Sequence, residues 1–154
     1  MLETPHVAIG AAIAVKIGNP YLALPLALAS HFVLDRIPHW NPHFYTEMKK
    51  LGKPSSKSTT LAIIDSLAAL GLGLAIAASA LPDTGRAAII LAACLLAVLP
   101  DQIKTPFFFL KETRKGWLKR YVLWERSLQV DGPVFWGNLT QLAVTLASLW
   151  WIYS

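Results

Sequence analysis

The sequence is poor in charged residues and in cysteine. Only 15% of its 154 residues are charged and 55% are hydrophobic, whereas a soluble domain usually carries about a quarter charged residues. The single cysteine, Cys94, excludes an internal disulfide and a zinc site built from cysteine ligands. Because no basic segment precedes an apolar core at the start of the chain, we also expect no cleaved signal peptide.

Three motifs of common enzyme classes are absent as well. The chain has no glycine-rich phosphate loop, no serine nucleophile elbow and no His-Glu-x-x-His sequence. The sequence therefore gives no indication of a P-loop nucleotide site, a serine hydrolase of the elbow type or a metalloprotease helix. The chemistry that it does suggest comes from histidines and aspartates near the ends of apolar segments.

Long apolar blocks are the main feature that is present, and they are typical of an integral membrane protein. We expect one all-α domain over residues 1–154. Its predicted elements are a short N-terminal helix over 6–17, four transmembrane helices over 20–37, 59–81, 86–103 and 134–153, and an interfacial amphipathic helix over 115–128. At about 1.5 Å per residue the first helix reaches about 18 Å, too short for a hydrocarbon core of about 30 Å.

The basic residues indicate how such a protein would be oriented. The net charge is +5, and most Lys and Arg residues lie in segments 38–58 and 104–133, which the positive-inside rule assigns to the cytoplasm. The prediction is a multi-pass protein of the cell inner (plasma) membrane with a cytoplasmic N-terminus and an outside C-terminus. Membrane lipids are the expected partners, and we expect no nucleic-acid binding.

The segment around residues 31–39 carries the first candidate site. His31, Asp35 and His39 are spaced i, i+4, i+8, so a helix places His31 and Asp35 on one face, one turn apart. Pro38 disfavours helix at the preceding residue, which leaves His39 just beyond the helix end and free to fold back. Two imidazoles and a carboxylate suit a divalent metal; the alternative is ordinary helix-end polarity with hydrogen bonds to the last carbonyls.

Three further residues are predicted at the same membrane depth: His6, Asp65 and Asp101. A lone carboxylate inside a spanning helix is costly unless it is paired or ligated, and the helix of Asp65 offers no Lys or Arg near it. Asp65 is therefore expected to bind the metal or to orient a ligand. For Asp101, which follows Pro100, the alternative to a site role is a helix terminus at the water boundary.

The donor set defines the expected cofactor and chemistry. Carboxylate and imidazole donors without thiolate fit a divalent ion, zinc first and Mn²⁺, Fe²⁺ or Mg²⁺ as alternatives. Such an ion with open positions would lower the pKa of bound water and polarise an ester or phosphoryl oxygen. A carboxylate off the metal could act as general base, and the catalytic candidates are Asp65 and His39. More than four donors leave room for two ions.

Three short segments resemble a known family. Residues 4–10 (TPHVAIG), 30–40 (SHFVLDRIPHW) and 99–103 (LPDQI) look like elements of small bacterial inner-membrane proteins known as membrane-bound metal-dependent hydrolases, which include LexA-regulated members. The resemblance implies metal ligation by His6, His31, Asp35 and Asp101. The order of the last two elements differs from that of longer members, whose His-Arg-Gly-x-Thr-His-Ser stretch is absent. Asp65 and His39 are the candidates to fill that gap.

Two functions follow from these observations, and the sequence leaves both open. The first is a membrane-embedded metal-dependent hydrolase whose site lies at the cytoplasmic interface and cleaves an ester or phosphoester, with a phospholipid favoured because the site opens at headgroup depth. The second is a non-catalytic metal-stabilised scaffold or lipid-binding protein. A transporter is disfavoured, because the polar groups gather at one interface instead of the midplane.

Overall fold

The computed structural model describes the backbone of residues 1–154 and every side chain except that of Glu112. Over these residues the chain forms seven α-helices, one short 3-10 helix and no strand. The helices are α1 (Glu3–Ile17), α2 (Pro20–Leu34), α3 (Phe44–Leu51), α4 (Ser56–Ala78), α5 (Thr84–Phe109), α6 (Gly116–Leu128) and α7 (Val134–Tyr153), with the 3-10 turn η1 at Lys111–Thr113. The predicted all-α class is confirmed.

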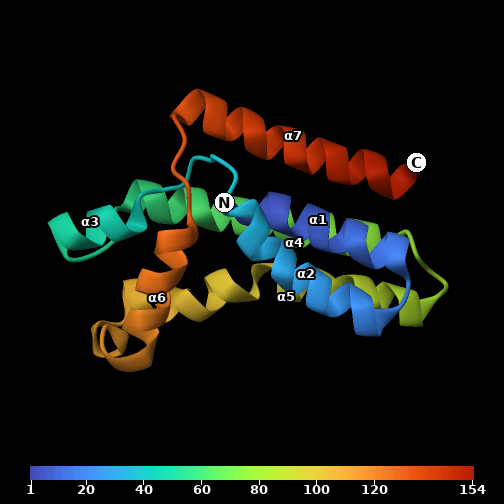
Figure 1. Cartoon of the computed structure of the whole chain (residues 1–154), viewed down its shortest axis with the longest axis horizontal. Coiled ribbons are helices and arrows are strands. Elements are labelled where there is room, and N and C mark those ends of the chain that lie inside the picture. Colours follow the sequence, from blue (N-terminus) through green and yellow to red (C-terminus); the bar gives the residue numbers. More distant parts are fainter.

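Helices α1, α2, α4, α5 and α7 extend along the molecule, with α1 packed among the others (Figure 1). Helix α1 contacts α2, α4, α5 and α7. Helices α3 and α6 lie together with their loops at one end, where α1 begins and α2 ends, and the C-terminus lies at the opposite end (Figure 1). This path brings the polar residues of α1, α2 and α5 to the end that carries α3 and α6.

The inside of the bundle is built from small residues. The buried cluster consists mainly of alanines, and Gly10 of α1 lies so close to α5 that an added Cβ would be 2.8 Å from the Cβ of Ala97. Large apolar side chains point outward instead, as at Leu67, which is 62% exposed, and Leu95, which is 60% exposed. Small residues inside and large apolar residues outside are typical of helices that pack against each other within a membrane.

Two helices, α4 and α5, are long and apolar enough to cross a membrane. Their 23 and 26 residues reach about 34 and 39 Å, and most of their apolar surface is not covered by the rest of the protein. Helix α2 is shorter than predicted, because it ends at Leu34 and not at residue 37. A turn follows, in which Arg36 and Ile37 donate to the carbonyls of Val33 and Leu34.

Helix α3 lies in segment 38–58, where the sequence predicted no helix. Phe44, Tyr45 and Met48 of this helix lie against Phe107 and Phe108 of α5, so a short amphipathic helix buries apolar surface there. It ends at Gly52, whose φ of 74° is in the left-handed region that favours glycine. The basic residues Lys49 and Lys50 of this helix are exposed.

Helix α5 is also longer than predicted. It continues through Pro106 to Phe109, whereas the sequence suggested an end near residue 103. Phe107 and Phe108 are buried against Leu118 and Val122 of α6, and this packing compensates for the backbone hydrogen bond that Pro106 cannot donate. The extension places the last turns of α5 directly beneath α6.

Candidate metal centre

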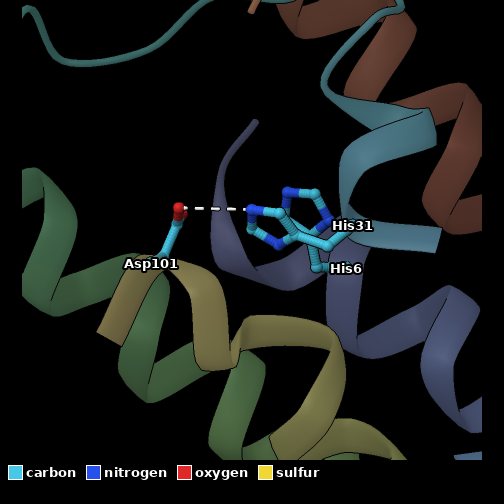
Figure 2. Close-up of side chains that lie close together, drawn as sticks. All are labelled: His6, His31 and Asp101. Atoms are coloured by element: carbon cyan, nitrogen blue, oxygen red, sulfur yellow. Dashed lines mark ion pairs between the residues drawn. The ribbon is translucent and has the colours of Figure 1, made fainter. Parts of the chain in front are cut away.

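Three side chains from three helices meet at one end of the bundle: His6 of α1, His31 of α2 and Asp101 of α5 (Figure 2). One ligand atom of each lies within 4.8 Å of the others, and a second group of the same kind joins His31 and Asp101 to Asp35 and Glu125. The rings of His6 and His31 stack with centroids 4.1 Å apart and an angle of 18° between their planes. The cluster therefore combines two imidazoles with up to three carboxylates.

His31 is oriented by the backbone of α5. Its Nδ1 lies 2.7 Å from the carbonyl oxygen of Ala97, and since a carbonyl only accepts, Nδ1 carries the proton and donates. The lone pair of neutral His31 is then on Nε2, which faces Asp35 Oδ2 at 3.5 Å and Asp101 Oδ1 at 3.4 Å. A backbone carbonyl that fixes the tautomer in this way is typical of metal-binding histidines.

His6 is fully buried, and among the described residues neither of its ring nitrogens has a hydrogen-bond partner. The Nε2 atom lies 3.5 Å from Asp35 Oδ1, beyond normal hydrogen-bonding distance. Leaving a buried polar group unsatisfied costs about 1–3 kcal/mol. His31 Nε2 is without a hydrogen-bond partner in the same sense. The two imidazoles thus offer unused nitrogens toward the same carboxylates.

Asp35 lies in the middle of the cluster and is almost completely buried. The Met1 amine contacts its Oδ1, and the amide of Gln129 donates to Oδ2 at 3.3 Å. Burial by itself raises the pKa of the Asp35 carboxyl, but His6, the Met1 amine and His31 outweigh it and hold the pKa well below its usual range. Asp35 is therefore an ionised carboxylate in this environment.

Lys104 and Glu125 complete the cluster, and neither was among the predicted site residues. The Lys104 Nζ lies 2.7 Å from Asp101 Oδ1 and 2.7 Å from Glu125 Oε1. Burial raises the pKa of the Glu125 carboxyl in spite of the Lys104 charge, and burial likewise raises the pKa of Tyr121 to about 12. A sequence signal existed, because Glu125 shares one helical face with the apolar Leu118 and Val122.

The separations within the cluster fit a divalent ion. Two ligand atoms at about 2.0–2.1 Å from one zinc-like ion, in tetrahedral directions, lie about 3.4 Å apart. The nitrogen–oxygen separations around His6, His31, Asp35 and Asp101 are 3.4–3.5 Å. With the unpartnered imidazole nitrogens, this arrangement is able to hold a divalent metal through His6, His31 and Asp101 or through His31, Asp35, Asp101 and Glu125. The donors do not select one metal.

His39 adjoins the cluster, but its ring nitrogens are engaged elsewhere. Its Nδ1 lies 2.7 Å from the carbonyl oxygen of Ile37, and its Nε2 lies 3.0 Å from the amide nitrogen of Asn41. The distance from His39 Nε2 to Asp35 Oδ1 is 3.8 Å. Burial and the positive charge at Met1 lower the pKa of His39. Its predicted ligand and catalytic roles stay predictions, with Asn41 as the group that would have to move.

Backbone contacts hold His39 in place. The His39 amide donates to the carbonyl of Val130 at 3.1 Å, and Gly132 donates to the carbonyl of His39 at 2.7 Å. Gly137 at the start of α7 approaches Trp40 so closely that an added Cβ would lie 2.3 Å from the Trp40 amide nitrogen. The chain after α2 is thus fixed between the α6–α7 connection and α7.

Asp65 of α4 lies beside the start of α1, and its carboxylate oxygens accept hydrogen bonds from that helix. The amide of Glu3 donates to Asp65 Oδ2 at 2.5 Å, and the hydroxyl of Thr4 donates to Oδ1 at 2.7 Å. The sequence suggested a metal or a buried cation as the partner of this carboxylate, and a helix N-terminus is a third solution. It also explains why α1 begins at Glu3, before the predicted start at residue 6. The predicted site roles of Asp65 stay predictions.

A pocket of about 360 Å³ lies beside the cluster. Its polar wall includes Asp101, Lys104 and Glu125, and its apolar wall includes Leu67 of α4 and Phe108 of α5. The cluster is therefore reachable from outside through a cavity that is polar at one end and apolar along its sides.

No protein-family model, no curated protein and no solved structure matches this chain. The assignment of a function therefore rests on the geometry and chemistry of the site.

Proposed function

We propose that the protein is a membrane-embedded metal-dependent hydrolase that cleaves an ester or phosphoester. The observation that carries this proposal is the set of buried, unpartnered imidazole nitrogens of His6 and His31, which face the carboxylates of Asp35 and Asp101. The adjoining pocket reaches this cluster at Asp101, which lines its wall. A buried set of metal-binding atoms beside a pocket is suited to a catalytic metal that a substrate can reach.

The residues of the chain have distinct tasks in this proposal. A bound divalent ion would supply a Lewis acid and an activated water at neutral pH. His31 and Asp101 would hold that ion together with His6 or with Asp35, and the Ala97 carbonyl keeps His31 in the tautomer that ligation needs. Gln129 donates to Asp35 and, at 2.6 Å, to Glu125, so it fixes two carboxylates relative to each other. The apolar pocket wall restricts water around the site.

Zinc is the first choice of metal, because nitrogen and oxygen donors about 3.4 Å apart suit its tetrahedral geometry. Mn²⁺, Fe²⁺ and Mg²⁺ are the alternatives. The resemblance to membrane-bound metal-dependent hydrolases belongs to the same proposal. Its support is that the four ligands it implies, His6, His31, Asp35 and Asp101, come from distant parts of the chain and lie together.

The proposed membrane topology has four spans, α2, α4, α5 and α7, with the N-terminus in the cytoplasm and the C-terminus outside, in the cell inner membrane. Because the 15 residues of α2 reach only about 22 Å, its span requires a locally thinner bilayer. The topology is supported by the position of α3 and α6, since the segments richest in Lys and Arg lie at one end of the bundle (Figure 1). Helix α6 exposes Trp117 together with Lys119 and Arg120, which suits a helix at an anionic lipid surface.

A non-catalytic scaffold is the second candidate, and Lys104 favours it. Its ammonium already neutralises Asp101 and Glu125 at 2.7 Å each, so the carboxylates are partly compensated without any ion. In that case the cluster would stabilise the bundle or support lipid binding without turnover.

Elemental analysis of the detergent-purified protein separates these candidates. We expect about one or two equivalents of a divalent transition metal per chain, lost in His31→Ala and retained in His43→Ala, whose exposed side chain lies outside the cluster. Turnover of a phosphoester or phospholipid by the loaded protein would then support the hydrolase. A wild type without metal after reconstitution with Zn²⁺ or Mn²⁺ would overturn the hydrolase and leave the scaffold.

A further inference from the structure

The pocket beside the metal cluster has two chemically different ends. We propose that it binds a phosphate-bearing amphiphile from the membrane, with an anionic phosphate oxygen on the Lys104 ammonium and the alkyl chain leaving between α4 and α5. This inference rests on the proposed function and deepens it, because it selects a phosphate ester of a lipid over a carboxylic ester.

The polar end is defined by Lys104. An ammonium group has three N–H donors; Lys104 donates one to Glu125 Oε1 and lies 2.7 Å from Asp101 Oδ1 in an ion pair, so these two carboxylates occupy at most two of them. The side chain is only 13% exposed, yet it lines the pocket. One donor of a nearly buried cation is therefore left for a ligand, and an anionic oxygen would form a charge-assisted hydrogen bond with it.

The apolar part of the pocket wall is defined by side chains of α4 and of the last turn of α5. Ile63, Leu67 and Phe109 line the pocket and are 55%, 62% and 48% exposed. They belong to the two helices that are apolar enough to cross a membrane. The pocket thus opens sideways onto the lipid-facing surface of these helices, where an alkyl chain can pass from the bilayer to the cluster.

Size and charge narrow the class of ligand. A volume of about 360 Å³ is at the lower end for ligand sites, so it accommodates a head group and the first carbons while the rest of the chain stays in the bilayer. A neutral carboxylic ester has no anionic oxygen for Lys104. A phosphate ester has such an oxygen. Its other oxygens would be repelled by the carboxylates of the cluster unless a divalent ion lay between them.

Binding of dodecylphosphonate to the purified protein in maltoside micelles, with and without Zn²⁺, tests this inference. The uncharged dimethyl ester of the same compound and the chainless methylphosphonate are the reference ligands. We expect dodecylphosphonate to bind most tightly and Lys104→Met to weaken it about tenfold without weakening the dimethyl ester. Lys104→Arg retains the charge and should keep the preference for the anion, which guards against a variant that merely misfolds.

A matched pair of variants on α4 tests the path of the chain. Leu67 and Leu70 are both exposed on the same helix, but only Leu67 is among the residues that line the pocket. Leu67→Trp should weaken dodecylphosphonate several-fold and leave methylphosphonate unchanged, whereas Leu70→Trp should change neither.

The outcomes separate this inference from the proposed function. Equal binding of the anionic and neutral ligands, an unaltered preference in Lys104→Met, or equal effects of the two α4 variants would overturn the amphiphile site even if the protein binds metal. The proposed hydrolase function is refuted separately, by a wild-type protein that contains no metal. The zinc-free titration then still tests Lys104 and the path of the chain.

Discussion

Two kinds of carboxylate lie at the same end of this molecule, and they differ in what faces their oxygens. Asp65 is met by donors, the Glu3 amide and the Thr4 hydroxyl. Asp35 and Asp101 also have donors, the Met1 amine and Gln129 for Asp35 and Lys104 for Asp101, but in addition both face His31 Nε2, at 3.5 and 3.4 Å. Because this imidazole nitrogen has no hydrogen-bond partner, a proton or a cation between it and the carboxylates would stabilise the contact.

The difference shows that burial alone does not mark a functional site. The first turn of a helix leaves backbone N–H groups without partners, and a carboxylate there also gains from the helix dipole. Asp65 supplies this cap to α1 from another helix. In the metal centre the imidazole tautomer decides the outcome, because the Ala97 carbonyl takes the proton-bearing nitrogen of His31 and turns its lone pair toward the carboxylates.

The largest effect is expected when the two kinds of carboxylate are neutralised separately. Asp101→Asn should weaken zinc binding by about a hundredfold or more, because it removes a charged ligand. Asp65→Asn should change it by less than about threefold, since Asp65 bonds α1 instead. Competition with a chelating dye measures both constants. An equal loss in Asp65→Asn would restore the predicted ligand role of Asp65 and refute its role as a cap alone.

The cap itself should matter for stability. Asp65→Ala leaves the Glu3 amide and the Thr4 hydroxyl without their acceptor, and we expect a loss of about 1–3 kcal/mol. Asp83→Ala is the matched control, because Asp83 caps α5 from within the same helix at an exposed position and should cost about 1 kcal/mol. Unfolding in dodecyl sulfate followed by circular dichroism compares them. A smaller loss for Asp65→Ala than for Asp83→Ala would contradict this account.

Lys104 is the donor that lies on Asp101 and Glu125, and its removal should sharpen the contrast. Lys104→Met takes away a positive charge 2.7 Å from Asp101 and Glu125, so the affinity for zinc should rise about tenfold. The metal-free variant should be less stable than the wild type, and zinc should restore it. Zinc titrations with thermal unfolding test this, and an unchanged affinity would show that Lys104 and the metal do not share the carboxylates.

The smallest effect concerns Glu47, a third carboxylate met by donors. The Ser55 amide and the Ser55 and Ser58 hydroxyls donate to it, and these bonds, the amide first, hold the pKa of Glu47 below 4.5. Its stabilising contribution is therefore present above that pH and lost as the pH falls below it. We expect less than about 1 kcal/mol.

Amide hydrogen exchange at the start of α4, followed from about pH 6 down to about pH 3, measures this loss. Glu47→Gln should remove most of the pH dependence. A wild type and a variant with the same pH profile would mean that the three hydrogen bonds do not stabilise this connection.

Much of the metal centre was predictable, and its missing parts have a common reason. His31 and Asp35 follow from helical spacing, and His6 and Asp101 follow from their place near the same ends of apolar segments. Lys104 and Glu125 were missed because the contact that joins them lies between α5 and α6; the place of Glu125 on the apolar face of α6 indicated burial but not its partner. Asp65 was predicted to lie in the metal centre because the sequence does not reveal its actual partners. The groups that donate to it belong to α1, about sixty residues earlier in the chain.

The sequence by itself determined the helical class, the apolar outward faces of α4 and α5, and the one-turn spacing of His31 and Asp35, because composition and periodicity are local properties. The tertiary structure decided which carboxylates face hydrogen-bond donors and which also face unpartnered imidazole nitrogens. That decision depends on contacts between helices, which set the tautomer of His31, cap α1 with Asp65 and bring Lys104 between Asp101 and Glu125.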